Sequence, residues 1–523
     1  MSTPDSPVAA VKAAGSPARQ QWSGQFGFII SAIGSAVGLG NIWRFPGVAY
    51  ENGGGAFLIP YLVALLTAGI PILFLDYAIG HRFRGGPPLA LRRIKRWLES
   101  LGWFQVMICF FIGIYYAVIL AWAASFFVFS FSQKWGDDTA SFFLFDYLHL
   151  PDAPAGYSLQ FVPGVLIPLV LIWVATIAVL VLGVAKGVER ANVVFMPLLV
   201  VAFLILVIRA VTLPGAADGL TALFTPDFSK LGSADVWIAA YSQIFFSLSI
   251  AFGIMITYAS YRRRKANQTT PGLVVAFANS SFEILAGIGV FSIIGFMAYQ
   301  QGTTVDQLSG LKGVSLAFIT FPKVVSEMPQ SWLFGALFFA SLLMAGFTSL
   351  ISILQVILAG FQDKFGLSVR RSALWIGGVM GLVSTLLFAT VQGLNVLDAL
   401  DKWINEVGIV LSAIVMSVVV IWVSRKGGEL SYHLSSLSTF KVKNLWLFLA
   451  GVLSPAMLTY MFIQVVISLI KQPYGGMPQW FLLIDGWGAI ALAVVGALIL
   501  TKLAWKRDPD NFEAWPVFQP SGK

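Results

Sequence analysis

About twelve stretches of roughly 20 mainly apolar residues run through this chain, and they limit its possible folds more than any other feature. They lie near residues 22–49, 55–80, 103–131, 162–183, 191–212, 235–261, 272–299, 332–360, 373–392, 396–424, 443–470 and 480–504. A helix of this length and composition can cross a bilayer. Hydrophobic residues make up 58% of the 523 positions and charged residues only 11%, which excludes a disordered chain and argues against a soluble enzyme. We therefore predict an all-α membrane protein with 12 transmembrane helices.

The basic residues are distributed unevenly between the ends of these stretches. With the N-terminus inside the cell, the inner segments hold 25 of the 33 Lys and Arg residues and the outer segments hold 7. Positive residues concentrate in cytoplasmic loops, so this bias predicts that both termini are cytoplasmic. Topology thus accounts for the net charge of +9, and nucleic acid is not expected as a partner.

Two polar tails flank one membrane domain. We predict cytoplasmic tails at 1–21 and 505–523 and a transmembrane domain at 22–504, with helices 1–5 over about 22–212, helices 6–10 over about 235–424 and helices 11–12 over about 443–504. The first tail lacks the apolar core of a signal peptide. Residues 300–331 include an apolar patch too short to span, which we expect to fold over the outer mouth as a lid.

The first apolar stretch carries an unusual group of glycines and polar residues. Gly34, Gly38 and Gly40 are followed by Asn41 and Arg44. Each glycine costs a helix about 1 kcal/mol relative to alanine, and an arginine inside a span is usually functional. Close packing through small residues is the other explanation. The combination favours an unwound segment that lines a cavity.

The sixth stretch is interrupted near its middle by Gln243, Ser247, Ser249 and Gly253. Spans one and six hold corresponding positions in two five-helix halves. Paired interruptions of this kind are typical of transporters whose site lies between inverted repeats. Broken helices direct amide groups at a carboxylate and free carbonyl groups at a cation.

Few residues suited to covalent or metal chemistry are present. Cys109 is the single cysteine, so no internal disulfide can form, and His81, His149 and His433 are too few for a metal cluster. No nucleophile–base pair appears in the spans. We expect no enzyme activity and no organic cofactor.

The segment GSAVGLGNIWRFPGVAYENGGGAFLIPY, together with AKGVER, VWIAAYSQIFFSLS, AGFTS and LDALDKW in this order, resembles the neurotransmitter:sodium symporter family. The resemblance runs from about Trp22 to the end of the twelfth span. It implies the LeuT fold, in which a 5+5 inverted repeat is followed by two extra helices and helices 1 and 6 are unwound. It also implies sodium-driven import of an amino acid by alternating access, with about two sodium ions per cycle.

The resemblance assigns a substrate pocket that combines main-chain amides, a tyrosine and apolar walls. These positions are Ser35, Leu39, Gly40, Ile112, Tyr116, Phe246, Ser249, Phe252, Ser349 and Ile353. Tyr116 would donate its hydroxyl to the substrate carboxylate beside the Leu39 and Gly40 amides. Gly38 stands where monoamine transporters carry an Asp, which favours an amino acid. The bulk of Ile112 and Leu350 suggests a small to medium neutral side chain, such as alanine, valine, leucine or methionine.

Two sodium sites are implied in the same way. The first would use Ala36, Asn41, Ser247 and Asn279, completed by the substrate carboxylate. The second would use Gly34, Val37, Ala345, Thr348 and Ser349. Hard oxygen ligands suit sodium, although each polar residue taken alone could equally form an interhelical hydrogen bond.

The family pattern also places two gates. Arg44 and Asp401 resemble the outer pair, and Arg19 and Asp363 resemble the inner pair. Trp22, Tyr258 and Tyr261 are expected beside the inner gate. Because such pairs must break in every cycle, they should be hydrated and only modestly stabilising.

Glu283 lies four residues after Asn279 and therefore on the same helix face. Chloride-dependent relatives usually have a small hydroxyl residue at this position. A carboxylate supplies the negative charge itself, which predicts chloride-independent transport, with Tyr61, Gln243 and Ser247 around it. A hydrogen-bonded structural Glu is the alternative. Asp76 is expected to tie helix 2 to unwound helix 6.

Other functions fit the same scaffold. The alternatives are a transporter of a non-amino-acid amine or osmolyte, a substrate-binding sensor, and a channel. We expect a multi-pass protein of a prokaryotic cytoplasmic membrane, present as a monomer or weak homodimer and in contact with the lipid bilayer.

Overall fold

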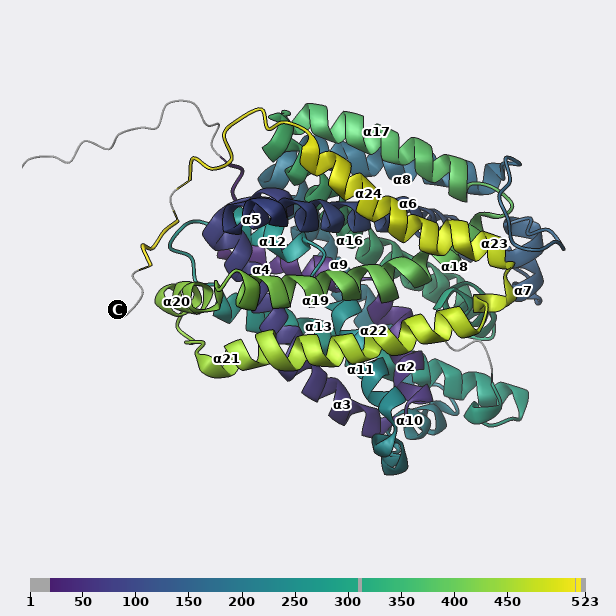
Figure 1. The fold of residues 1–523 in the computed structure, drawn as a ribbon. Coiled ribbons are helices and arrows are strands. Elements are labelled where there is room, and N and C mark those ends of the chain that lie inside the picture. The colour runs from purple at the N-terminus through teal and green to yellow at the C-terminus, as the bar shows by residue number, and fades with distance from the viewer. Residues whose placement is uncertain (1–18, 309–312, 513, 519–523) are drawn as a thin grey trace, which may run out of the picture.

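The chain folds into a bundle of helices, shown in Figure 1 as a computed structural model. The structure describes residues 19–308, 313–512 and 514–518. Within these residues, ten continuous helices are long and apolar enough to cross a membrane, and the bent pair Gln25–Ala36 and Gly40–Glu51 makes an eleventh. The sixth expected span falls outside this count because it is divided into two short helices. Most of the expected tail 1–21 lies outside the described residues.

The first half of the chain contains α1 (Gln25–Ala36), α2 (Phe45–Glu51), α3 (Leu58–Ala64), α4 (Ile70–Phe83), α5 (Pro87–Ile94), α6 (Glu99–Ser130), α7 (Thr139–Ser141), α8 (Pro163–Val181), α9 (Glu189–Val211) and α10 (Ala216–Phe224). The second half contains α11 (Ala234–Ser247), α12 (Ile254–Ser260), α13 (Thr269–Gln301), α14 (Gly313–Ser315), α15 (Phe321–Ser326), α16 (Ser331–Phe365), α17 (Val369–Phe388), α18 (Gly393–Trp403), α19 (Val410–Val418), α20 (Gly427–Leu437), α21 (Asn444–Phe448), α22 (Ser454–Lys471), α23 (Gln479–Phe481) and α24 (Gly488–Lys502).

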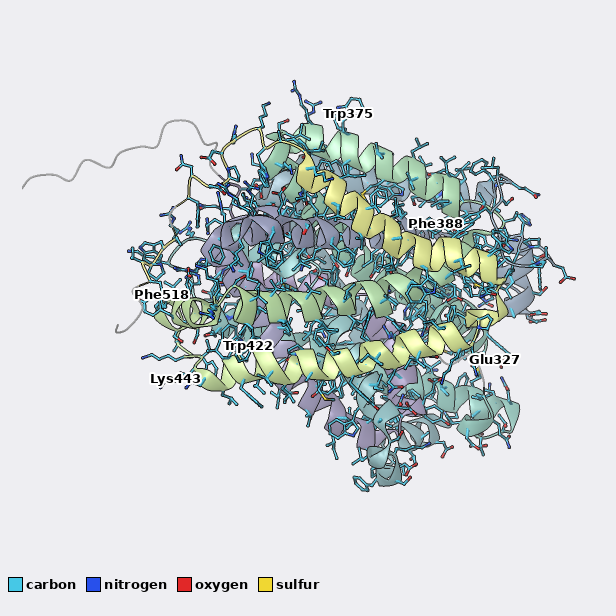
Figure 2. All side chains as sticks on the ribbon, in the orientation of Figure 1. Glu327, Trp375, Phe388, Trp422, Lys443 and Phe518 are labelled. Carbon is cyan, nitrogen blue, oxygen red and sulfur yellow. The ribbon has the colours of Figure 1, made fainter. Side chains whose placement is uncertain are left out.

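Two long helices form the centre of the bundle. α6 and α16 pack against each other. In the most apolar 18-residue segment of each span, 83% and 89% of the residues are buried. The outer helices α8, α17 and α24 bury only a third of theirs. Their remaining side chains are apolar but exposed, as Trp375 on α17 shows in Figure 2. Such a surface requires lipid as its solvent, which agrees with the composition of the chain.

The first span is broken where the glycines cluster. α1 ends at Ala36, and Val37 has extended main-chain angles (φ −74°, ψ 102°). A wide helical turn, η1 (Gly40–Arg44), then leads into α2, and the two parts of the span are bent by 47°. The break therefore lies between Ala36 and Gly40, as the glycine spacing predicts.

The sixth span is broken between α11 and α12. Three residues in this gap have left-handed main-chain angles: Ser249 (φ 53°), Ala251 (φ 68°) and Gly253 (φ 96°). Only glycine adopts this conformation at little cost. Ser249 and Ala251 must therefore be held in place by their surroundings.

Polar side chains from three other helices hold Ala251. Its N–H donates to the Asp76 carboxylate of α4 at 2.9 Å, as expected for Asp76. Its carbonyl accepts hydrogen bonds from Gln105 Nε2 of α6 (3.1 Å) and Ser412 Oγ of α19 (2.6 Å). These partners satisfy main-chain groups that a continuous helix would have paired internally.

The two ends of the bundle differ in charge. We call the end that carries residues 82–96 and 262–265 the basic end; α5 and α20 mark it on the left of Figure 1. The opposite end, marked by α7, α18 and α23 on the right, is called the vestibule end. At the basic end the C-terminal tail packs back on the bundle, where Asp510 pairs with Arg96 at 3.0 Å.

Candidate substrate and sodium site

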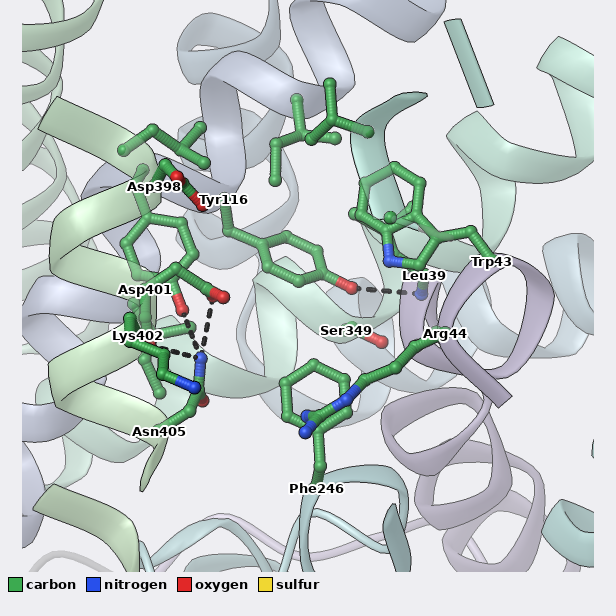
Figure 3. Close-up of a pocket in the computed structure, with 18 of the residues that line it drawn as sticks. Leu39, Trp43, Arg44, Tyr116, Phe246, Ser349, Asp398, Asp401, Lys402 and Asn405 are labelled. Carbon is green, nitrogen blue, oxygen red and sulfur yellow. Dashed lines mark hydrogen bonds between the residues drawn. The ribbon is translucent and has the colours of Figure 1, made fainter. Parts of the chain in front are cut away.

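The breaks in the first and sixth spans face one cavity of about 860 Å³, which extends from the middle of the bundle to the vestibule end. Its wall includes residues beside both breaks together with α6, α16 and α18 (Figure 3). Ile319, from the apolar segment expected to act as a lid, also lines it. The centre of the membrane domain is thus reached from the vestibule end.

The structure brings all ten expected substrate residues to this cavity. They are Ser35, Leu39, Gly40, Ile112, Tyr116, Phe246, Ser249, Phe252, Ser349 and Ile353. Polar groups from the two breaks lie on one side, and apolar side chains of α6 and α16 form another. Such a mixture suits a ligand with a charged head and a short apolar tail.

Tyr116 meets the break in the first span. The Leu39 N–H lies 3.3 Å from the Tyr116 hydroxyl oxygen, as the dashed line in Figure 3 shows. Gly38 is closely approached here, since a Cβ atom at this position would lie 2.8 Å from Ser349 Oγ and 3.0 Å from the Tyr116 hydroxyl. The Ser349 and Tyr116 hydroxyls therefore come closer to the main chain at Gly38 than a side chain at this position would allow.

Aromatic side chains bound the cavity along the second break. Phe246 lies against Gly40, where a Cβ atom would be 2.2 Å from the ring, and the Arg44 guanidinium is 4.6 Å from the ring centre. The carbonyl of Phe252 accepts a hydrogen bond from the buried Cys109 thiol at 3.1 Å. Phe246 thus packs against both Gly40 and the Arg44 guanidinium in the cavity wall.

Three of the four candidate ligands of the first sodium site are linked by hydrogen bonds. Asn41 Nδ2 donates to Asn279 Oδ1 at 2.9 Å, and Asn279 Nδ2 donates to Ser247 Oγ at 2.9 Å. Asn41 Oδ1 accepts from the Gly38 N–H, and Ala36 lines the cavity beside it. The breaks in both spans and α13 therefore direct amide and hydroxyl oxygens at one region.

The candidate ligands of the second sodium site come from α1 and α16. Ser349 Oγ lies 3.5 Å from the Gly34 carbonyl oxygen, and Thr348 Oγ1 donates to the Ala345 carbonyl at 2.9 Å. Val37 stands at the end of α1, where the helix leaves carbonyl groups unpaired. Gly34 and Ser349 thus bring oxygens of α1 and α16 together, as a site for a hard cation requires.

Glu283 is fully buried in α13, one turn from Asn279. Its carboxylate accepts hydrogen bonds from the Tyr61 hydroxyl and from Gln243 Nε2, the latter at 2.5 Å. No lysine or arginine forms a salt bridge with it in the part of the chain that the structure describes. A carboxylate thus stands beside the candidate sodium residues.

The expected inner gate is closed at the basic end. Arg19 Nη1 lies 2.7 Å from Asp363 Oδ1, and Arg19 also donates to the Ser260 hydroxyl. Trp22 Nε1 donates to the Tyr258 carbonyl at 2.9 Å, and the Arg19 guanidinium is 5.0 Å from the Tyr261 ring centre. The five predicted residues therefore form one connected cluster at the basic end.

The expected outer pair is not joined. Arg44 and Asp401 both line the cavity, but no salt bridge links them. Asn405 Nδ2 instead donates to Asp401 Oδ1 at 2.7 Å and to the Tyr115 hydroxyl at 3.1 Å (Figure 3). The cavity thus reaches Arg44 and Asp401, but none of the inner-gate residues lines it.

Sequence reasoning missed several residues that shape the site. Gln105 and Ser412 brace Ala251, and Asn405 holds Asp401. Each is a polar residue within an apolar stretch, which is itself a sign of function in a membrane helix. Their partners are more than 100 positions away or depend on the local helix geometry, so no spacing pattern identifies them.

Comparison with known proteins agrees with this geometry. Residues 19–142 and 135–507 match the profile of the sodium:neurotransmitter symporter family. The chain is 39% identical over 489 residues to an uncharacterised sodium-dependent transporter of Methanocaldococcus jannaschii, covering 93% of this chain and 98% of the relative. It is 35% identical over 384 residues to the sodium- and chloride-dependent creatine transporter 1 of Mus musculus and of Homo sapiens, covering 66% of this chain and 60% of each relative.

The broken helices and the central cavity define a helical membrane transporter. The matches cover most of the chain, which therefore belongs to the sodium:neurotransmitter symporter family and has the LeuT fold of that family. It is a sodium-dependent transporter of this family.

Proposed function

We propose that this protein imports a small to medium neutral amino acid together with sodium by alternating access. The observation that carries the proposal is that Tyr116 and Leu39 line the same cavity as Ala36, Asn41 and Ser247, three of the candidate ligands of the first sodium site. A substrate carboxylate placed there would meet the hydroxyl and amide donors and, on its other side, a sodium ion. Sharing the carboxylate in this way couples the binding of ion and substrate.

Gly38 supports an amino acid over an amine that lacks a carboxylate. An amine needs an anionic partner from the protein, and the space beside Tyr116 and Ser349 has no side chain at residue 38 to supply one. The wall opposite is formed by Ile112 and Ile353, which limits the volume for the substrate side chain. Alanine, valine, leucine and methionine are the proposed substrates.

We further propose that transport needs no added chloride, because the Glu283 carboxylate supplies the negative charge near the first sodium site. Its buried position beside Tyr61 and Gln243 supports this role. Two sodium ions per cycle, bound by the two sets of oxygens described above, complete the proposal. The basic end would face the cytoplasm of a prokaryotic cell, in keeping with the positive-inside rule.

The test is uptake into proteoliposomes that contain the purified protein. A panel of labelled amino acids, with creatine added because of the creatine-transporter relatives, identifies the substrate. Sodium, chloride and proton gradients are then imposed one at a time. Concentrative uptake of a neutral amino acid that depends on sodium and persists in gluconate supports the proposal, and selective uptake of creatine would redirect it.

A further inference from the structure

The contact between α1 and α9 buries two oxygen-bearing side chains of α9 against glycine residues of α1. Gly27 and Gly34 are seven residues apart on α1 and so share a face. A Cβ atom at Gly27 would lie 2.0 Å from Glu189 Oε1, and one at Gly34 would lie 1.9 Å from Asn192 Oδ1. Glu189 and Asn192 are themselves three residues apart on α9. The glycine face of α1 therefore lies directly against both side chains.

Asn192 has an oxygen with no partner. The side chain is fully buried, and its amide nitrogen donates to the Val188 carbonyl at 2.8 Å. Its Oδ1 accepts no hydrogen bond from any residue that the structure describes. Leaving such a buried acceptor unpaired is unfavourable, because the oxygen has lost its hydrogen bonds to water. The oxygen faces Gly34, a candidate ligand of the second sodium site.

Glu189 lies one turn nearer the basic end and has no cation partner among the described residues. The residue is 6% exposed, and its carboxylate accepts hydrogen bonds from the Ser23 N–H, at 2.9 Å, and from the Ser23 hydroxyl. Both donors belong to the segment just before α1. If α1 moved away from α9, the carboxylate would lose both donors and remain as an uncompensated anion, which strongly favours a cation.

We propose that Glu189 and Asn192 form a transient sodium site on α9, which takes up sodium released from the second sodium site as the ion leaves toward the basic end. The inference rests on the proposed sodium coupling. In the present state α1 covers the site, and Ser23 donates hydrogen bonds to the Glu189 carboxylate. Opening of the basic end removes Ser23 and Gly34 together, so that one anionic and one neutral oxygen become available to a hard cation.

The test separates sodium release from the other steps of the cycle. Net sodium-driven uptake requires release of both substrate and sodium, whereas exchange of substrate under equal high sodium on both sides requires release of the substrate alone. With the amino acid that the panel selects, Glu189→Gln should lower the kcat of net uptake about fivefold or more and change exchange by less than about twofold. Asn192→Leu, which keeps the shape of the side chain, should likewise lower the ratio of net uptake to exchange. Equilibrium binding of labelled sodium in detergent should stay within about twofold of wild type for both variants, because the site is covered in the closed state.

Two further variants decide between a cation site and a simple latch on α1. Ser23→Ala removes a donor to Glu189 but leaves the carboxylate, so net uptake should be retained or increased. Arg190→Gln changes an exposed charge on the same helix and is the control for folding and surface charge. The proposal is overturned if Ser23→Ala reproduces Glu189→Gln, if Glu189→Gln slows exchange and net uptake equally, or if it slows neither. Lack of sodium-driven uptake by the wild-type protein would instead refute the proposed function.

Discussion

Arg19 and Asp363 form a 2.7 Å ion pair that ties the segment before α1 to α16. Asp363 also accepts a 2.7 Å hydrogen bond from the Gly86 N–H, so one carboxylate joins three parts of the basic end. Both side chains are less than one-fifth exposed. Closure of the basic end thus depends on a small number of polar contacts that water can replace.

Asp363→Asn should shift the population toward an open basic end. The substitution removes the charge of a partly exposed pair, worth up to about 1 kcal/mol, or about a fivefold change in population. Hydrogen exchange of residues 19–36 should become faster, and Asp363→Glu should restore part of the protection. Unchanged exchange in Asp363→Asn would show that the ion pair does not control closure.

Gly38→Val should weaken amino-acid binding by at least about tenfold, because a side chain there would displace the Ser349 and Tyr116 hydroxyls, which lie on the cavity wall. Gly38→Ala should have a smaller effect in the same direction. Gly378→Ala is the matched control, since a Cβ atom there would meet nothing within 4 Å. The measurement is the Kd of the labelled amino acid in sodium, and an unaltered Kd in Gly38→Val would place the substrate elsewhere.

Glu283→Ser should make transport depend on chloride. The serine removes the negative charge and opens space between Tyr61 and Gln243, where an anion could replace the carboxylate. Uptake by the variant should be low in gluconate and recover in chloride, whereas Glu283→Gln should be impaired in both because it removes the charge without opening the space. Chloride-independent uptake by Glu283→Ser would refute the role given to Glu283.

Acid should loosen the contact between α4 and α20. His433 on α20 shares a 2.9 Å hydrogen bond with His81 of α4, and burial, with His81, Arg82 and Arg84 nearby, lowers the pKa of His433 to about 2. Its pKa in the unfolded chain is about 6.5, so the unfolded state takes up the proton first as the pH falls. This loses up to about 2 kcal/mol of stability between pH 6.5 and pH 5.

Thermal unfolding in detergent measures this effect. The Tm of the wild-type protein should fall below pH 6.5, and His433→Gln should show a flatter profile. His149→Gln, at an exposed histidine, is the control. A wild-type profile that matches His433→Gln between pH 5 and pH 7 would contradict the buried neutral histidine.

The sequence predicted the membrane bundle because a span leaves a local signal, a run of apolar residues of fixed length. It also located the break in the first span, since Gly34, Gly38 and Gly40 lie together in the chain. The pocket residues came from family motifs, and the structure places all ten at one cavity. Each of these features is local, since the residues that make it up are near one another in the chain.

Contacts between distant helices left no such signal. Gln105 and Ser412 meet at Ala251 only because α6 and α19 cross beside the second break. Asn192 is an ordinary polar residue in the sequence, and its unpartnered oxygen becomes evident only against Gly34. The helix α20 lies between the predicted spans 396–424 and 443–470, where the sequence has no long apolar run, and its packing against α4 stabilises it.

Uptake under a sodium gradient is the decisive measurement of whether transport is coupled to sodium. Proteoliposomes are loaded with potassium and diluted into sodium or potassium buffer, each with one labelled neutral amino acid from the panel. The account predicts concentrative uptake in sodium that collapses when a sodium ionophore removes the gradient, and none in potassium. Uptake of equal size in both buffers would contradict sodium coupling and with it the functions assigned to the two candidate sodium sites.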